Sequence, residues 1–103
     1  MDDSHQIDIP PSFMALYVPP GRIKPTLPWP ELAARYELCE DLAQMLTDTT
    51  ASQQFKLGMT QEAALSHCLQ GLQDTSEVVS PAEAIWVVTR LAELLQWPAL
   101  AQP

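Results

Sequence analysis

The sequence predicts an all-α fold: a small bundle of three main helices, with a short N-terminal helical turn and a proline-rich arm packed on the bundle. Apolar residues recur every three or four positions along three long segments, which is the spacing of a helix with one face on a core. Capping residues and prolines stand where these helices would begin. No segment alternates apolar and polar residues for long enough to predict a strand.

We expect three parts along the chain: a mobile N-terminus and proline-rich arm over residues 1–29, a helical domain over 30–97, and a disordered tail over 98–103. A chain of 103 residues is the usual size of one domain and can bury enough surface for a core. Most of the ten prolines lie in the first third of the chain, which separates the arm from the body.

The arm carries more apolar side chains than a solvated tether needs. Residues 10–12 can open one helical turn over 11–17, and this turn has to stop before Pro19, because a proline disfavours helix in the residue before it. Beyond Pro19 the prolines hold the backbone extended. We therefore expect the segment from Phe13 to Trp29 to be ordered on the body, with the apolar surface around it as a partner-binding site.

A first long helix is predicted over residues 30–48. Pro30 suits the first helical position, and Glu31 complements the positive end of the helix dipole. The polar stretch 47–54 is predicted to be a loop. The core stripe of this helix comprises Leu32, Tyr36, Cys39, Ala43 and Leu46, and it is widened by Leu38, Leu42 and Met45.

A second helix is predicted over residues 60–72. Thr60 is a good N-cap, and Gly71 marks the C-terminal end, because a glycine costs about 1 kcal/mol relative to alanine inside a helix. Phe55 and Leu57, which precede this helix, are expected to cover one end of the core. Its apolar stripe comprises Leu65, Cys68, Leu69 and Leu72.

The third helix, over residues 81–96, has the strongest start signal. Ser80 is the cap, a proline takes the first helical position, and Glu83 completes a capping box. Trp86 and Arg90 lie one turn apart, a spacing that permits a structural cation–π pair. The core stripe comprises Ala84, Ile85, Val88, Leu91, Ala92 and Leu95.

Thirteen acidic residues against five basic ones give a net charge of −8. Binding to nucleic acid needs clustered lysines and arginines that displace counterions, and only Arg22 and Lys24 lie close together. We therefore expect no binding to nucleic acid or to anionic membranes.

The N-terminus has neither the basic region nor the apolar region of a secretory signal, and no apolar run approaches the length of about 18 residues that a membrane span needs. Cys39 and Cys68 both fall inside predicted helices among apolar residues. We expect a cytoplasmic protein with two reduced, buried cysteines. A disulfide between the two helices is the alternative.

The sequence predicts no catalytic, cofactor or metal site. None of the three glycines belongs to a phosphate-binding loop of the form GxxxxGK[ST] or GxGxxG, so we expect the protein alone not to bind ATP tightly. His67 and Cys68 are adjacent, so on a helix their side chains point about 100° apart and cannot easily share a metal ion. An enzyme of unrecognised type would have to use Cys39 or His67.

Residues 22–28 match R-x-x-P-x-x-P, a form that aromatic-grooved domains bind as a polyproline helix, although packing of the arm on its own domain is favoured. Three short helices cannot enclose one another fully, which leaves an apolar face for a partner. That partner is expected to be a protein. The net charge of the chain favours a basic one, whereas Arg22 and Lys24 fit an acidic partner or the acidic helix of a second copy in a weak homo-oligomer. Alternatively, the arm completes the core and meets no partner. The predicted partner-binding residues are Phe13, Tyr17, Arg22, Ile23, Lys24, Leu27 and Trp29.

Three stretches are distinctive in combination: IPPSF at 9–13 leading into VPPGR at 18–22, LGMT at 57–60, and WVVTRLAELL at 86–95. With these stretches the whole chain resembles a family of small uncharacterised β-proteobacterial proteins, some of which are labelled "ATPase with chaperone activity". The resemblance carries over no catalytic residue.

The leading functional hypothesis is a protein-interaction or adaptor module, with the accessory role in a chaperone system that the resemblance implies. One alternative is an ATPase with chaperone activity, as the family label states. The other is an unrecognised enzyme.

Overall fold

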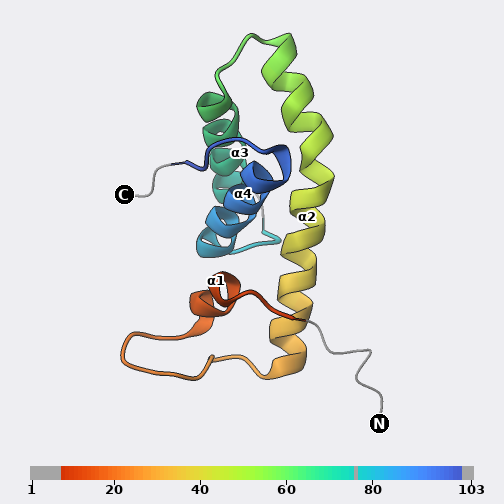
Figure 1. Cartoon of the computed structure of the whole chain (residues 1–103). Helices are drawn as coiled ribbons and strands as arrows, with labels where there is room; N and C mark the ends of the chain where they lie inside the picture. The colour runs from red at the N-terminus through yellow and green to blue at the C-terminus, as the bar shows by residue number, and fades with distance from the viewer. Residues whose placement is uncertain (1–7, 76, 101–103) are drawn as a thin grey trace. The chain divides into compact units, whose positions relative to one another are not determined.

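The computed structural model describes residues 8–75 and 77–100 (Figure 1). Within these ranges there are helices and no strand, so the predicted all-α class is confirmed, with three main helices and a short N-terminal one. The helical elements are α1 (Pro11–Met14), the 3-10 turn η2 (Ala15–Tyr17), α2 (Trp29–Lys56), α3 (Gln61–Thr75) and α4 (Pro81–Leu95).

The chain divides into two units, Met1–Glu37 and Leu38–Pro103, and α2 belongs to both. The first unit contains α1, η2, the proline-rich loop and the opening turns of α2. The second contains the rest of α2 together with α3 and α4. Of the predicted mobile terminus and the predicted tail, residues 1–7 and 101–103 lie outside the described ranges.

An aromatic cluster forms the interior of the first unit. The Phe13 side chain, on α1, is fully buried. Its ring centroid lies 5.8 Å from that of Tyr17 and 5.6 Å from that of Tyr36 on α2, the latter in an edge-to-face arrangement. Such pairs are worth about 0.5–1.5 kcal/mol beyond the area they bury. The cluster therefore fixes the base of the arm to the opening turns of α2.

Helix α2 runs to Lys56, so the prediction of a loop over 47–54 is wrong. No glycine or proline interrupts the sequence between Pro30 and Gly58, and two of the polar residues in this stretch form side-chain hydrogen bonds within the helical structure. The Thr47 hydroxyl donates to the Gln44 carbonyl at 2.8 Å. Thr50 is 5 % exposed and its hydroxyl is hydrogen-bonded with the Cys68 thiol of α3. The contact with α3 and the absence of a helix-breaking residue thus override the weak helix propensity of this polar stretch.

Helix α2 ends at a glycine. Gly58 has a φ of 63°, the left-handed conformation that favours glycine. The Met59 N–H donates to the Gln54 carbonyl at 3.0 Å and the Gly58 N–H to the Phe55 carbonyl at 3.4 Å, the bonding pattern of a Schellman motif.

The two additional turns of α2 change the environment of the residues at its end. Phe55 and Leu57 were expected to cover the core, and this prediction is wrong, because their side chains are 83 % and 70 % exposed. With the helix continued, they lie beyond the core rather than over it.

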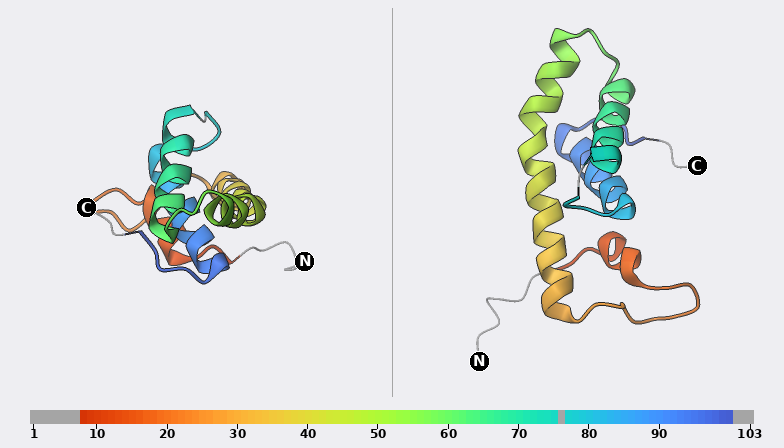
Figure 2. Two further views of the ribbon diagram at one scale, coloured as in Figure 1. Left: turned by 90° about the horizontal axis from the view of Figure 1, so that it is seen from above. Right: turned by 180° about the vertical axis from the view of Figure 1, so that it is seen from behind.

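Residues from all three long helices form the core of the second unit. Leu65 of α3 and Val88, Leu91 and Ala92 of α4 are its buried centre. Helices α3 and α4 lie beside each other and beside the later turns of α2 (Figure 2). The partly buried side chains around the centre are Leu46, Cys68, Leu69, Leu72, Leu95, Trp97 and Leu100.

The termini of α3 and α4 follow the sequence signals in all but one place. The capping box at α4 is confirmed: the Glu83 N–H donates to the Ser80 hydroxyl at 3.1 Å, and the Ser80 N–H donates to the Glu83 carboxylate at 2.9 Å. Helix α3 begins after its predicted cap, where the Thr60 hydroxyl accepts the Ala63 N–H. The prediction that Gly71 ends α3 is wrong, because the helix continues to Thr75.

Candidate functional site

The candidate site is the loop between η2 and α2, residues 19–28, called here the basic loop. Pro19 to Arg22 form a type II turn, in which Gly21 has a φ of 78° and the Arg22 N–H donates to the Pro19 carbonyl at 3.0 Å. A bond of 2.7 Å from the Thr26 N–H to the Tyr17 carbonyl closes the base of the loop. The turn and this bond present the residues between them to solvent.

The tip of the basic loop is an apolar side chain between two cations. Ile23 is 92 % exposed, and Arg22 and Lys24 on either side of it are exposed as well. Neither cation forms an ion pair with any residue in 8–75 or 77–100. A single exposed apolar side chain is ordinary at a protein surface. Ile23 is distinguished by the cation on each side of it, and these two charges determine which surfaces it can approach.

The other predicted partner-binding residues occupy different environments. Phe13 is fully buried in the aromatic cluster and Tyr17 is half-buried beside it. Leu27 is half-buried, and Trp29, at the first position of α2, is 47 % exposed. Phe13 and Tyr17 thus hold the base of the arm, while the surface available to a partner is at the tip of the loop and around Trp29.

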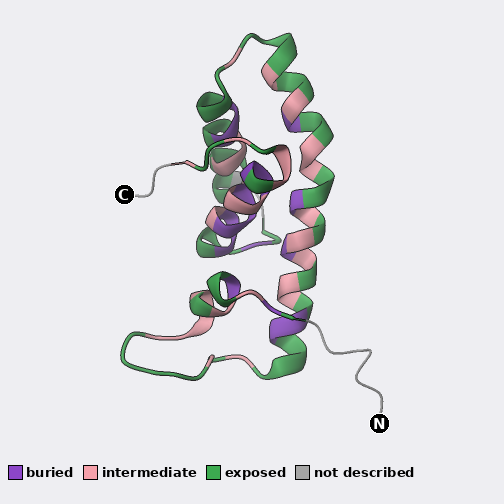
Figure 3. Ribbon diagram, viewed as in Figure 1, coloured by how far each residue is buried: buried purple, intermediate pink, exposed green. Residues whose placement is uncertain are grey.

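A second exposed surface runs along α2 in the second unit, and sequence reasoning missed it. Figure 3 shows exposed positions along the side of α2 that faces away from α3 and α4. Five exposed residues between positions 41 and 55 are separated by four, three, four and three positions, a spacing that puts them all on one face of a helix. Two are apolar: Met45 is 71 % exposed and Phe55 is 83 % exposed. The prediction that Met45 widens the core stripe is therefore wrong, because its side chain lies on the solvent side of α2. We call this surface the outer strip; it comprises Asp41, Met45, Asp48, Ser52 and Phe55.

An ion pair joins α2 to α4 on another face of α2. The Arg90 guanidinium donates to both oxygens of the Glu40 carboxylate, at 2.8 and 3.0 Å, and to Glu93 at 3.2 Å. Hydrogen bonding from Arg90 lowers the pKa of Glu40, against the opposing effect of burial, and the bond to Glu40 raises the pKa of Arg90. The cation–π pair of Arg90 with Trp86, which is buried on the same helix, stays a prediction. The ion pair with Glu40 holds the two helices together.

The residues considered for catalysis do not present reactive groups together. Cys39 is fully buried on α2, and His67 is exposed on α3. Cys68 is half-buried, and burial raises the pKa of its thiol, which disfavours the reactive thiolate. Both cysteines are thiols, not a disulfide pair. A buried thiol such as Cys39 would require the fold to open before it could meet a substrate.

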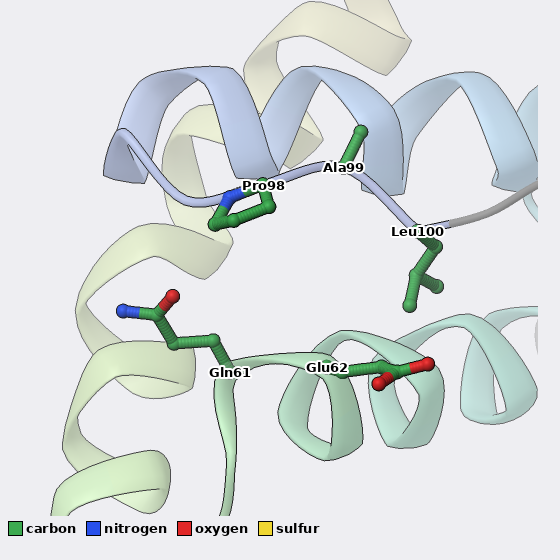
Figure 4. Close-up of a pocket in the computed structure, with 5 residues that line it drawn as sticks. All are labelled: Gln61, Glu62, Pro98, Ala99 and Leu100. Atoms are coloured by element: carbon green, nitrogen blue, oxygen red, sulfur yellow. The ribbon is translucent and has the colours of Figure 1, made fainter.

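A hollow of about 420 Å³ lies between the start of α3 and the residues that follow α4 (Figure 4). Its lining offers one carboxylate and one amide, from Glu62 and Gln61, and is otherwise apolar, with Pro98, Ala99 and Leu100. In the described part of the chain, no buried side-chain nitrogen or oxygen lacks a hydrogen-bond partner. The hollow therefore contains no buried polar group that would fix a small ligand.

Within the described ranges, no three residues of the metal-binding types cluster to hold an ion. Of the helices described, none is long and apolar enough to cross a membrane. Comparison with protein-family models, with curated proteins and with solved structures gave no match.

Proposed function

We propose that the protein is a protein-interaction module and that the basic loop is its contact segment. The observation that carries this proposal is the tip of the loop, where Ile23 is 92 % exposed between two cations. An accessory role in a chaperone system, as implied by the resemblance given above, is one setting for such a module.

The chemistry of the tip specifies the partner surface. Burying an isoleucine side chain fully is worth about 1.5–3 kcal/mol, and a loop already fixed by a turn loses less conformational freedom on binding than a free segment does. Arg22 and Lys24 require acidic groups on both sides of the recess that receives Ile23. The partner is therefore a protein surface with a small apolar area flanked by carboxylates.

The overall charge does not oppose this contact at close range. The net charge of −8 repels an acidic partner at a distance. At physiological ionic strength the screening length is about 8 Å, so within the contact the two loop cations dominate. Such a contact selects its partner by matching charges, and salt weakens it.

Site-specific photo-crosslinking in the cells that produce the protein tests the proposal. A photoreactive apolar residue at position 23 should give one discrete crosslinked product. The same residue at position 78 is the control, since Val78 is also exposed, at 54 %, but has no cation beside it. Adding Arg22→Glu and Lys24→Glu should abolish the product from position 23. Equal products from both positions, or a product that survives the charge reversal, would contradict the proposal.

A further inference from the structure

We propose that the surface which receives the basic loop is the outer strip of α2 on a second copy of this chain. The inference rests on the proposed function above and names the partner for it. The strip has the composition that the loop requires, with exposed apolar side chains between carboxylates.

The outer strip repeats acid, apolar and acid along one helical face. Asp41 and Asp48 are seven residues apart, which places them on the same side of α2 at about 10 Å along its axis. Met45 lies between them and is 71 % exposed. Neither carboxylate forms an ion pair with another described residue. Two unpaired charges and an exposed apolar side chain therefore face solvent together.

The tip of the basic loop repeats the same order with the opposite charge. The α-carbons of Arg22 and Lys24 are at most about 7 Å apart, and their long, flexible side chains can spread their charges further than that. The two cations can therefore reach Asp41 and Asp48 while Ile23 contacts Met45. Each surface supplies the charge that the other lacks.

The composition of the chain favours a second copy as the occupant. Only five basic residues occur in 103, and two of them flank the most exposed large apolar side chain described. When the loop of one copy binds the strip of another, two outcomes are open. Either the second copy's loop binds the first copy's strip and a closed dimer forms, or it binds a third copy and a longer assembly forms. Because each contact involves one loop tip and about two turns of helix, it belongs to the small, weak class of interfaces.

Sedimentation equilibrium of the purified full chain, over a range of concentrations, tests the inference. The average mass of the wild-type protein should rise with concentration and fall as salt is added. The double variant Arg22→Glu/Lys24→Glu, with a reversed loop, and the double variant Asp41→Lys/Asp48→Lys, with a reversed strip, should each show a dissociation constant at least about tenfold higher.

Mixing the two reversed variants provides the decisive comparison. In the mixture each reversed surface meets its complement, so association should return. Both variants keep a net negative charge, because the chain starts at −8 and each substitution changes the charge by two units. Overall charge therefore opposes the association that matched surfaces should restore. The control Glu62→Lys/Asp74→Lys makes the same change of charge as the reversed strip, but on exposed positions of α3, and should associate like wild type.

The failures of the two proposals are distinguishable. A wild-type protein that stays monomeric at every concentration would overturn self-docking, and so would a mixture that fails to associate while both variants retain helical circular dichroism. If position 23 nevertheless crosslinks to a different protein in cells, the proposed function stands and only the second copy is wrong. If neither association nor a specific crosslink is found, both proposals fall.

Discussion

Single backbone conformations decide where the helices of this protein end. Gly58 and Gln96, which follow α2 and α4, have φ values of 63° and 61°. The Trp97 N–H donates to the Ala92 carbonyl at 2.9 Å, so α4 closes in the same way as α2 although its left-handed residue is a glutamine. Gly71, in contrast, lies inside α3 without a positive φ. A glycine therefore ends a helix in this protein where its backbone is left-handed, as at Gly58, and not wherever a glycine occurs in the sequence.

These two kinds of glycine predict opposite effects of the same substitution. Gly71→Ala should raise the free energy of unfolding by about 1 kcal/mol, because alanine is the better helix former and nothing lies within 4 Å of an added Cβ. Gly58→Ala, the matched control, should lower it by about 1 kcal/mol, because its φ is left-handed. Urea denaturation of both variants measures the difference. If both substitutions changed the free energy of unfolding in the same direction, α2 and α3 would not end where they are described to end.

At the scale of elements, the sequence predicted the features that depend on neighbouring residues. It did not predict those that depend on contacts between residues far apart in the chain. The Ser80–Glu83 capping box was predicted from sequence because all its groups lie within four residues. The end of α2 was not, because Thr50 is stabilised by Cys68 on the next helix. Nothing local predicts the pair between Glu40 and Arg90, which are fifty residues apart.

The candidate surfaces follow the same rule. The basic loop could be predicted, because its prolines, Gly21 and cations are contiguous in the sequence. The outer strip could not, because the predicted core stripe includes Met45 and the predicted helix ends at Asp48, before Ser52 and Phe55. The spacing of four, three, four and three was present in the sequence and would have indicated the strip, had the helix been extended.

The Glu40–Arg90 pair predicts a pH dependence of stability. Hydrogen bonding from Arg90 lowers the pKa of Glu40 below its usual value of 4.5, so the folded state favours the charged carboxylate. The resulting stabilisation is complete above that usual value and is lost as the pH falls through the lowered one. Glu40→Gln should cost about 1 kcal/mol near neutral pH and should flatten the acid limb of the curve. Chemical denaturation at several pH values measures both effects.

Glu93→Gln serves as the control for this prediction. Its side chain is 60 % exposed and makes one bond of 3.2 Å with Arg90, so the cost should stay below about 0.5 kcal/mol. If Glu40→Gln and Glu93→Gln prove equally costly, or if the acid limb is unchanged in Glu40→Gln, the pair does not couple α2 to α4 as described.

For the whole molecule, the distribution of charge matters more than its sum. The chain is strongly acidic, yet its basic loop and its outer strip are locally opposite in sign, and each has an apolar side chain at its centre. A binding surface of this kind combines apolar burial for affinity with charge for selection. The central claim is therefore that the basic loop of one copy meets the outer strip of a second copy.

Nitrogen–proton correlation spectra of the labelled chain over a dilution series test this claim most directly. The amides of residues 22–24 and 41–48 should shift with concentration along one common binding curve. Those of Leu91 and Ala92, in the core of the second unit, should stay in place. Shifts confined to only one of the two surfaces, or curves with different midpoints, would contradict the account, as would spectra that do not change on dilution.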